Sequence, residues 1–311
     1  MKKKRKLGIR AAAAAMALLL SLSLLTACGE SKSTPVVEAE KKSSLQIDLD
    51  AWPVIDGATA LAPYYEAMAA ALLDMDIADA RQYVLCSKTD GAYENLIEGK
   101  ADMIFCSLPS DDILQTAEAA GVQFETTAFL NGAFVFFVNK DNPVDSLTIE
   151  QLHDIYTGKI TNWKEVGGDD VEIIPYQRSE NSGSQNGMYR YIAGKDEIME
   201  APTELVIGEM GEIVDAVASY DNAAGAIGYS YYYYVANMHY TDDIKLLEID
   251  GIEPSDATIA DGTYPIINQS FVIIRSDEPE DSVCRTIIDW IVSEEGQELG
   301  EENGYVRNAE L

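Results

Sequence analysis

The chain has 311 residues and a formal net charge of −31, with 53 acidic residues against 22 Lys and Arg. Without the six cations among the first ten residues, the remainder carries about −37 (−31 less six); such a surface repels nucleic acid and anionic headgroups and argues against both as partners. With two histidines and no metal-ligand spacing among four cysteines, neither a metal site nor a cofactor is expected.

Residues 1–28 predict a targeting segment that is not part of the fold. A basic stretch precedes an apolar run, Ala11 to Leu25, which is too short to span a bilayer comfortably. The run ends in Leu-Thr-Ala-Cys, a bacterial lipobox, so we expect cleavage before Cys28 and lipidation of its thiol. An ordinary cleaved signal peptide with a chance cysteine is the alternative. Residues 29–44 are polar without apolar periodicity and predict a flexible tether.

The rest of the chain alternates strand-like and helix-like segments, which predicts an α/β fold. Strands are expected at 82–86, 102–106, 133–139, 171–176, 226–229 and 266–274. Helices are expected at 92–98, 110–120, 149–156, from about 185, 209–219, 281–292 and from 296. Ser110 is the expected N-cap of its helix, and Thr148 with Gln151 predicts a capping box.

Two sets of residues have a structural interpretation that we favour over a functional one. Cys86, Cys106 and Cys284 remain once Cys28 is lipidated, and we expect plain buried thiols. A disulfide between Cys86 and Cys106 is the alternative, because both close predicted strands. The four consecutive tyrosines at 231–234 are expected to pack beside a strand, with a ligand platform as the alternative.

Two predicted helix starts are suited to holding an anion. The first N–H groups of a helix lack intrahelical partners and attract negative charge. Acids in the first turn would cancel this attraction, as at Asp111 and Asp112. No acid lies between residues 57 and 65, nor between 181 and 195.

The stretch from Arg178 to Ser184 carries the strongest chemical signal. A guanidinium four residues before a Ser-Gly-Ser turn offers a forked cation, two hydroxyls and several N–H groups. Gly183 would allow the backbone to approach a ligand closely. On local chemistry alone, an ordinary polar loop with an N-capping serine is the equal alternative.

Six blocks of the chain carry a family resemblance. The most specific is residues 147–168, LTIEQLHDIYTGKITNWKEVGG. The others are 134–144, 224–229, 261–266, 293–297 and 304–306. In this order they resemble the phosphate-binding subunits of bacterial phosphate ABC importers and their Gram-positive relatives, over roughly residues 50–311.

The resemblance implies a two-lobed periplasmic-binding-protein fold (type II-like), in which each lobe is a central β-sheet flanked by helices and two strands form the hinge. The first lobe would comprise 45–130 plus 265–311, and the second 131–264. Family ligand contacts, carried over position by position, fall on Thr59, Ala60, Ser87, Thr89, Ser107, Arg178, Ser182, Gly183 and Ser184.

One position departs from the family pattern. Well-studied phosphate binders have an Asp directly after the serine that corresponds to Ser107, and this Asp accepts a hydrogen bond from protonated phosphate and so rejects sulfate. Here Leu108 follows. We hypothesise that Asp56 substitutes as the acceptor.

The function implied is an extracytoplasmic solute-binding lipoprotein that captures inorganic phosphate and delivers it to the permease subunits of an ABC importer. We expect a monomer, lipid-anchored through Cys28 on the outer face of the cell membrane, as in Gram-positive bacteria. The alternatives are a binder of sulfate, molybdate or an organic phosphate, or a sensing or adhesive lipoprotein. An enzyme is not expected, because neither serine of the Ser-Gly-Ser turn lies in a G-x-S-x-G context.

Overall fold

The computed structural model describes residues 43–311 apart from 181, 220–223 and 309–310. The predicted signal peptide, the lipidation site Cys28 and most of the predicted tether lie outside the described residues. The tether prediction is wrong for its last two residues. Ser43 is buried, and the Ser44 N–H donates to Glu295 Oε1 at 2.8 Å, so the fold already includes these residues.

A mixed sheet of eight strands runs through the described part of the chain, in the order β1-β2-β11-β3-β8-β5, with β9 and β12 also paired to β3. Its strands are β1 Ile55–Gly57, β2 Met103–Cys106, β3 Phe124–Asn139, β5 Ile174–Pro175, β8 Ala226–Tyr231, β9 Ile244–Leu246, β11 Ile267–Arg275 and β12 Val306–Arg307. Two short parallel pairs, β4–β10 and β6–β7, comprise Ser146–Leu147, Glu248–Ile249, Gln177–Arg178 and Val206–Ile207.

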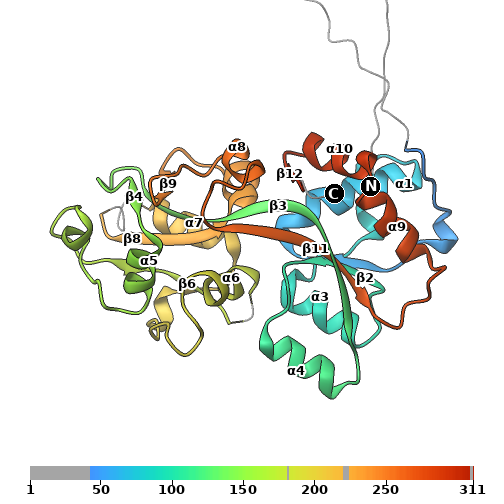
Figure 1. Ribbon diagram of the computed structural model, residues 1–311, viewed down its shortest axis with the longest axis horizontal. Coiled ribbons are helices and arrows are strands. Elements are labelled where there is room, and N and C mark those ends of the chain that lie inside the picture. The colour runs from blue at the N-terminus through green and yellow to red at the C-terminus, as the bar shows by residue number, and fades with distance from the viewer. Residues whose placement is uncertain (1–42, 181, 220–223, 309–310) are drawn as a thin grey trace, which may run out of the picture. The chain divides into compact units, whose positions relative to one another are not determined.

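Helices lie on both sides of the two long central strands. They are α1 Ala62–Leu73, α2 Ile77–Ala80, α3 Lys88–Ile97, α4 Asp111–Ala119, α5 Ile149–Tyr156, α6 Gly183–Tyr191, α7 Met210–Ala218, α8 Asp256–Ala260, α9 Val283–Ile291 and α10 Glu294–Glu302. Strands β3 and β11 run side by side between two groups of helices, with α1, α3, α4, α9 and α10 in one group and α5 to α8 in the other (Figure 1).

Strand β3 links two separate hydrophobic cores. Its first part pairs with β11, and its second part, from Phe134, pairs with β8. Buried side chains from 55–130 and 272–305 form two adjoining clusters, here called the first core. Buried side chains from 133–266 together with Val306 form the second core. The predicted two-lobed α/β fold is therefore confirmed, while the proposed lobe boundaries remain a prediction.

Several predicted elements are confirmed with their caps. Ser110 Oγ accepts from the Ile113 N–H at 3.3 Å, and Thr148 and Gln151 form the expected reciprocal capping box. Residues 133–139 are all buried, as expected for a strand covered on both faces.

The strand predicted at 82–86 is wrong. A 3₁₀ turn, Arg81–Tyr83, occupies its start, and only Val84 bridges to β1. Helix α3 begins at Lys88 rather than 92, with Ser87 at the N-cap position. Helix α6 begins at Gly183 rather than 185, because Ser182 is its N-cap.

The three described cysteines are free. Cys106 and Cys284 are buried as predicted, and no disulfide joins Cys86 to Cys106. Cys86 is exposed, so the expectation of a buried thiol is wrong there, since its segment is a surface loop instead of a strand.

Among residues the structure describes, no helix has the length and apolar character needed to cross a membrane.

Candidate functional site

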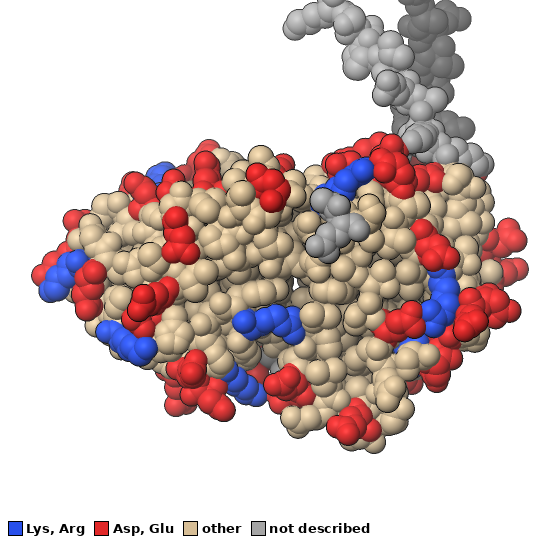
Figure 2. Space-filling view, viewed as in Figure 1, with Lys and Arg blue, Asp and Glu red and all other residues tan. Residues whose placement is uncertain are grey.

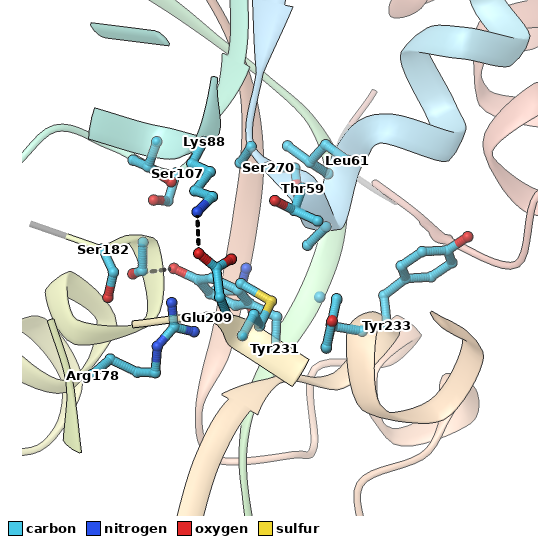
Figure 3. Close-up of a pocket in the computed structure, with 18 of the residues that line it drawn as sticks. Thr59, Leu61, Lys88, Ser107, Arg178, Ser182, Glu209, Tyr231, Tyr233 and Ser270 are labelled. Carbon is cyan, nitrogen blue, oxygen red and sulfur yellow. Dashed lines mark hydrogen bonds and ion pairs between the residues drawn. The ribbon is translucent and has the colours of Figure 1, made fainter. Parts of the chain in front are cut away.

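A cavity of about 670 Å³ lies where the two cores face each other. The first core contributes the turn before α1, the start of α3 and the end of β2. The second core contributes the Arg178 loop, the start of α6 and the start of α7. Strands β3 and β11 supply residues 131–133 and 268–270 to its wall. Figure 3 shows these elements around the cavity, with Thr59, Ser107, Arg178 and Ser182 among the labelled side chains.

The start of helix α6 presents polar groups to the cavity. Ser182 accepts from the Gln185 N–H at 3.2 Å, and the first turn carries no acid. Gly183 lies against Thr89 of α3: a Cβ at Gly183 would lie 2.7 Å from Thr89 Oγ1 and 3.7 Å from Ser107 Oγ. The first turn of α6 thus meets hydroxyl groups of the first core, and its free N–H groups favour an anion.

Arg178 is almost fully buried, at 5% exposed, yet no carboxylate among the described residues is hydrogen-bonded to it. Its Nε donates to the Ile207 carbonyl oxygen at 3.0 Å and its Nη2 to the Gly208 carbonyl oxygen at 2.9 Å. The third group, Nη1, is buried and has no hydrogen-bond partner in the part of the chain that the structure describes. Burial lowers the pKa of Arg178, while nearby groups including Glu209 oppose that shift. A buried, unpaired cationic donor is costly and favours an anionic partner.

Backbone bonds fix the position of Arg178. Its N–H is held by Gln185 Oε1 at 3.0 Å and by the Tyr229 hydroxyl at 2.9 Å. These partners lie on α6 and β8, inside the second core. The guanidinium is therefore aimed into the cavity before any ligand arrives, which lowers the entropic cost of binding.

Two serines near the cavity hold hydroxyls in buried positions. Ser107 Oγ and Ser184 Oγ make no hydrogen bond of normal geometry. Beside Ser107, the Tyr231 hydroxyl already donates to the Gly183 carbonyl oxygen at 2.7 Å. Ser107 lines the cavity, so its hydroxyl can donate to a ligand there at little cost, whereas Ser184 is not among the lining residues.

The hypothesis that Asp56 is an acceptor for the ligand is wrong. Its carboxylate is fully buried and does not line the cavity. Oδ1 accepts from the backbone N–H groups of Gly57 at 2.7 Å and Ser87 at 2.8 Å, and Oδ2 accepts from Asn95 at 2.7 Å. Asp56 instead fixes the loop that precedes α3.

Acidic residues outnumber cations around the cavity. Lys88 and Arg178 face six carboxylates: Asp90, Glu94, Glu180, Glu209, Glu212 and Asp215. Lys88 Nζ and Glu209 Oε1 lie 2.5 Å apart across it. On the face of the molecule shown in Figure 2, acidic side chains are also more widespread than Lys and Arg.

Eight of the nine predicted ligand residues line the cavity: Thr59, Ala60, Ser87, Thr89, Ser107, Arg178, Ser182 and Gly183. Ser184 does not; its side chain is 1% exposed and faces the protein interior. The sequence reasoning missed Lys88, although it lies between two predicted residues. The tyrosines at 231–234 also line the cavity while packing on neighbours such as Tyr305, so packing and lining occur together.

No cluster of three His, Cys, Asp or Glu side chains in the described ranges is placed to hold a metal ion. The donors gathered here are guanidinium, ammonium, hydroxyl and backbone N–H groups. Such a set suits a tetrahedral oxyanion.

Comparison with known proteins identifies related molecules. Residues 48–295 match the model of the PBP superfamily domain. The chain is 26% identical over 185 residues to the phosphate-binding protein PstS of Borreliella burgdorferi (58% of this chain, 64% of the relative) and 29% identical over 170 residues to that of Bacillus subtilis (54% and 53%). The chain thus spans less than two thirds of either relative.

A solved structure resembles the described fold over most of its length. It is a putative phosphate ABC transporter substrate-binding protein with bound phosphate from Clostridium perfringens, with a TM-score of 0.65 and 25% sequence identity. The likeness covers 82% of this chain and 99% of that chain.

Proposed function

The chain belongs to the PBP superfamily, and we propose that it is a solute-binding protein that captures inorganic phosphate between its two lobes for an ABC importer. The first lobe would comprise residues 45–130 and 265–311, and the second 131–264. Relatives that bear the name phosphate-binding protein, and a solved neighbour with bound phosphate, support this substrate.

The observation that carries the proposal is the buried Nη1 of Arg178. In the described structure this donor has no partner, while the other guanidinium donors are held by backbone carbonyls. An anion in the cavity would satisfy it and would also accept from Ser107, Ser182 and the first N–H groups of α6. Each charge-assisted hydrogen bond contributes roughly 1.5–3 kcal/mol. Several of them can sustain the roughly 8 kcal/mol of a micromolar complex after the costs of association.

The contact between Gly183 and Thr89 supports capture by closure. Because these residues belong to different cores, an anion bound between them interacts with both at once. Strands β3 and β11 pass between the cores and would form the hinge. A ligand that bridges the cores favours the closed form by its extra contacts there.

The proposed role is binding and delivery rather than catalysis. The cavity brings together donors for an anion, and the nearest histidine, His239, is bonded to Asp215 at 2.8 Å. We propose that Cys28 carries a lipid that keeps the protein on the extracytoplasmic face of the membrane. Permease subunits would then receive the ligand there.

One observation favours a different oxyanion, such as sulfate, as the substrate in place of phosphate. Ser107 is followed by Leu108, and Asp56 is turned away from the cavity. Neither position supplies a hydrogen-bond acceptor for a protonated phosphate oxygen, which is the group that would favour phosphate over sulfate.

The test is calorimetric titration of the chain lacking residues 1–28, stripped of endogenous ligand, with phosphate and with sulfate. Residues 42–311 form one compact unit, so this form retains the whole fold. One-to-one phosphate binding that Arg178→Ala abolishes supports the proposal. Binding of sulfate but not of phosphate would change the proposed substrate to sulfate. Binding of neither anion would refute the proposal.

A further inference from the structure

Lys88 and Glu209 meet across the cavity from different cores. Lys88 is the first residue of α3, and Glu209 immediately precedes α7, 121 positions later. Their Nζ–Oε1 distance is 2.5 Å. Figure 3 shows the Glu209 carboxylate between the ammonium group of Lys88 and the guanidinium of Arg178.

The backbone of Lys88 has an unusual conformation. Its φ is +64°, in the left-handed region that costs free energy for any residue with a Cβ. Ser87 and Thr89 on either side both line the cavity. The Ser87 N–H is fixed by buried Asp56, which holds the turn in place. A residue kept in a strained conformation beside a binding site is a recognised sign of a functional constraint.

The Glu209 carboxylate marks a point that two cations attract. The hydrogen bond from Lys88 and its charge lower the pKa of Glu209, and the charge of Arg178 lowers it further. Arg178 lines the same cavity, and its buried Nη1 has no hydrogen-bond partner among the described residues. A carboxylate resembles a tetrahedral oxyanion in its negative charge and its acceptor oxygens, so a group that binds one at this point can bind the other.

We propose that Lys88 is a second cationic ligand for the bound anion. In the absence of the anion, the ammonium group of Lys88 is paired with the Glu209 carboxylate. The inference rests on the proposed function and names a binding residue beyond the nine predicted ones. On binding, Lys88 leaves Glu209 for an anion oxygen, and the Glu209 carboxylate turns to solvent.

The exposure of the pair makes this exchange inexpensive. The side chains of Lys88 and Glu209 are 56% and 57% exposed, and ion pairs exposed to that degree contribute little to stability. Arg178, at 5% exposed, is instead fixed. The site thus combines a rigid cation with a movable one whose resting partner competes with the ligand.

The experiment is a double-mutant cycle with Lys88→Met, Glu209→Gln and both together, titrated calorimetrically with inorganic phosphate. Lys88→Met should weaken binding about tenfold, the loss of one partly exposed charge-assisted contact. Glu209→Gln should tighten binding a few-fold, because it frees Lys88 and removes a like charge. The tightening should be smaller in the Lys88→Met background, where there is no ammonium group left to free.

Lys195→Met is the matched control. Lys195 also joins the two cores, through Asp112 at 2.9 Å and Glu180 at 2.5 Å. Glu180 lines the cavity and is retained in this variant, whereas Lys195 and Asp112 do not line it. Its removal should leave the affinity within about twofold of the parent protein. Unfolding midpoints of all variants show that they are folded.

Two outcomes would overturn the inference. Weakening by Lys88→Met and Glu209→Gln alike would mean that the pair only holds the cores together. An unchanged affinity in Lys88→Met would mean that the ammonium group does not touch the anion. If the parent protein binds no oxyanion, the proposed function fails first and this inference with it, which the parent titration shows before any variant is made.

Discussion

Gly183 and Thr89 lie so close that a Cβ on the glycine would lie 2.7 Å from the threonine hydroxyl oxygen. Real Cβ atoms essentially never approach another atom so closely, so only glycine fits while the starts of α6 and α3 remain in contact. Because the two residues belong to different cores, this contact limits how closely α6 and α3 approach each other at the cavity.

Gly183→Ala should weaken phosphate binding about tenfold or more, because α6 must move away from Thr89, which is itself 4% exposed and has little room to give. Titration calorimetry measures the effect. Gly208→Ala is the matched control: Gly208 lines the same cavity, and a Cβ there would meet nothing within 4 Å. Equal affinities for the two variants would contradict the proposed closure.

Arg178→Lys should weaken binding roughly 10- to 100-fold despite preserving the charge. A lysine cannot bond both the Ile207 and Gly208 carbonyl oxygens and still present a donor to the cavity. The affinity can be compared with that of Arg285→Lys, whose parent side chain pairs with Glu125 away from the cavity. A fully functional Arg178→Lys protein would show that the site needs a charge only.

Asp56→Asn should destabilise the protein by about 1–3 kcal/mol, because one of three donors would lose its carboxylate acceptor. Urea unfolding measures this change. Since Asp56 does not line the cavity, the ratio of phosphate to sulfate affinity should stay the same. A change in that ratio would show that Asp56 contributes to the choice of anion after all.

Salt should affect the rate of phosphate association more than the affinity. The chain's net charge of −31 repels an approaching anion, and at physiological ionic strength charges beyond about 8 Å are largely screened. Stopped-flow association should therefore accelerate with added sodium chloride while the calorimetric affinity changes little. A steep loss of affinity with salt would show that binding depends on long-range attraction.

Cys86 should react with a thiol reagent much faster than Cys106 or Cys284 in the form lacking residues 1–28. Burial raises the pKa of Cys106 well above its ordinary value and raises that of Cys284 to about 12, so their thiolates are scarce. Cys86 is exposed. A fast phase of one thiol that Cys86→Ser removes is expected, and three equal rates would contradict the described burial.

The sequence by itself determined features that depend on neighbouring residues. A capping box needs only Thr148 and Gln151 three positions apart, and an anion-binding helix start needs only an acid-free turn after Ser182. The spacing of Arg178 from that turn suited a binding residue and an ordinary polar loop equally, and the family resemblance is what favoured binding. The alternation of apolar segments likewise predicted the α/β class and five strands of the main sheet, β2, β5, β8, β11 and the second part of β3.

Only the tertiary structure decided which distant groups share the cavity. Asp56 is a plausible acceptor in sequence, but the packing of β1 against the turn before α3 directs its carboxylate to backbone N–H groups instead. Ser184 belongs to the predicted motif, yet the turn of α6 carries its side chain inward. The contact between Lys88 and Glu209 joins residues 121 positions apart, and it exists because β3 and β11 bring two separately packed cores face to face. The spacing of residues along the chain cannot predict that contact, because the contact depends on how the whole chain folds.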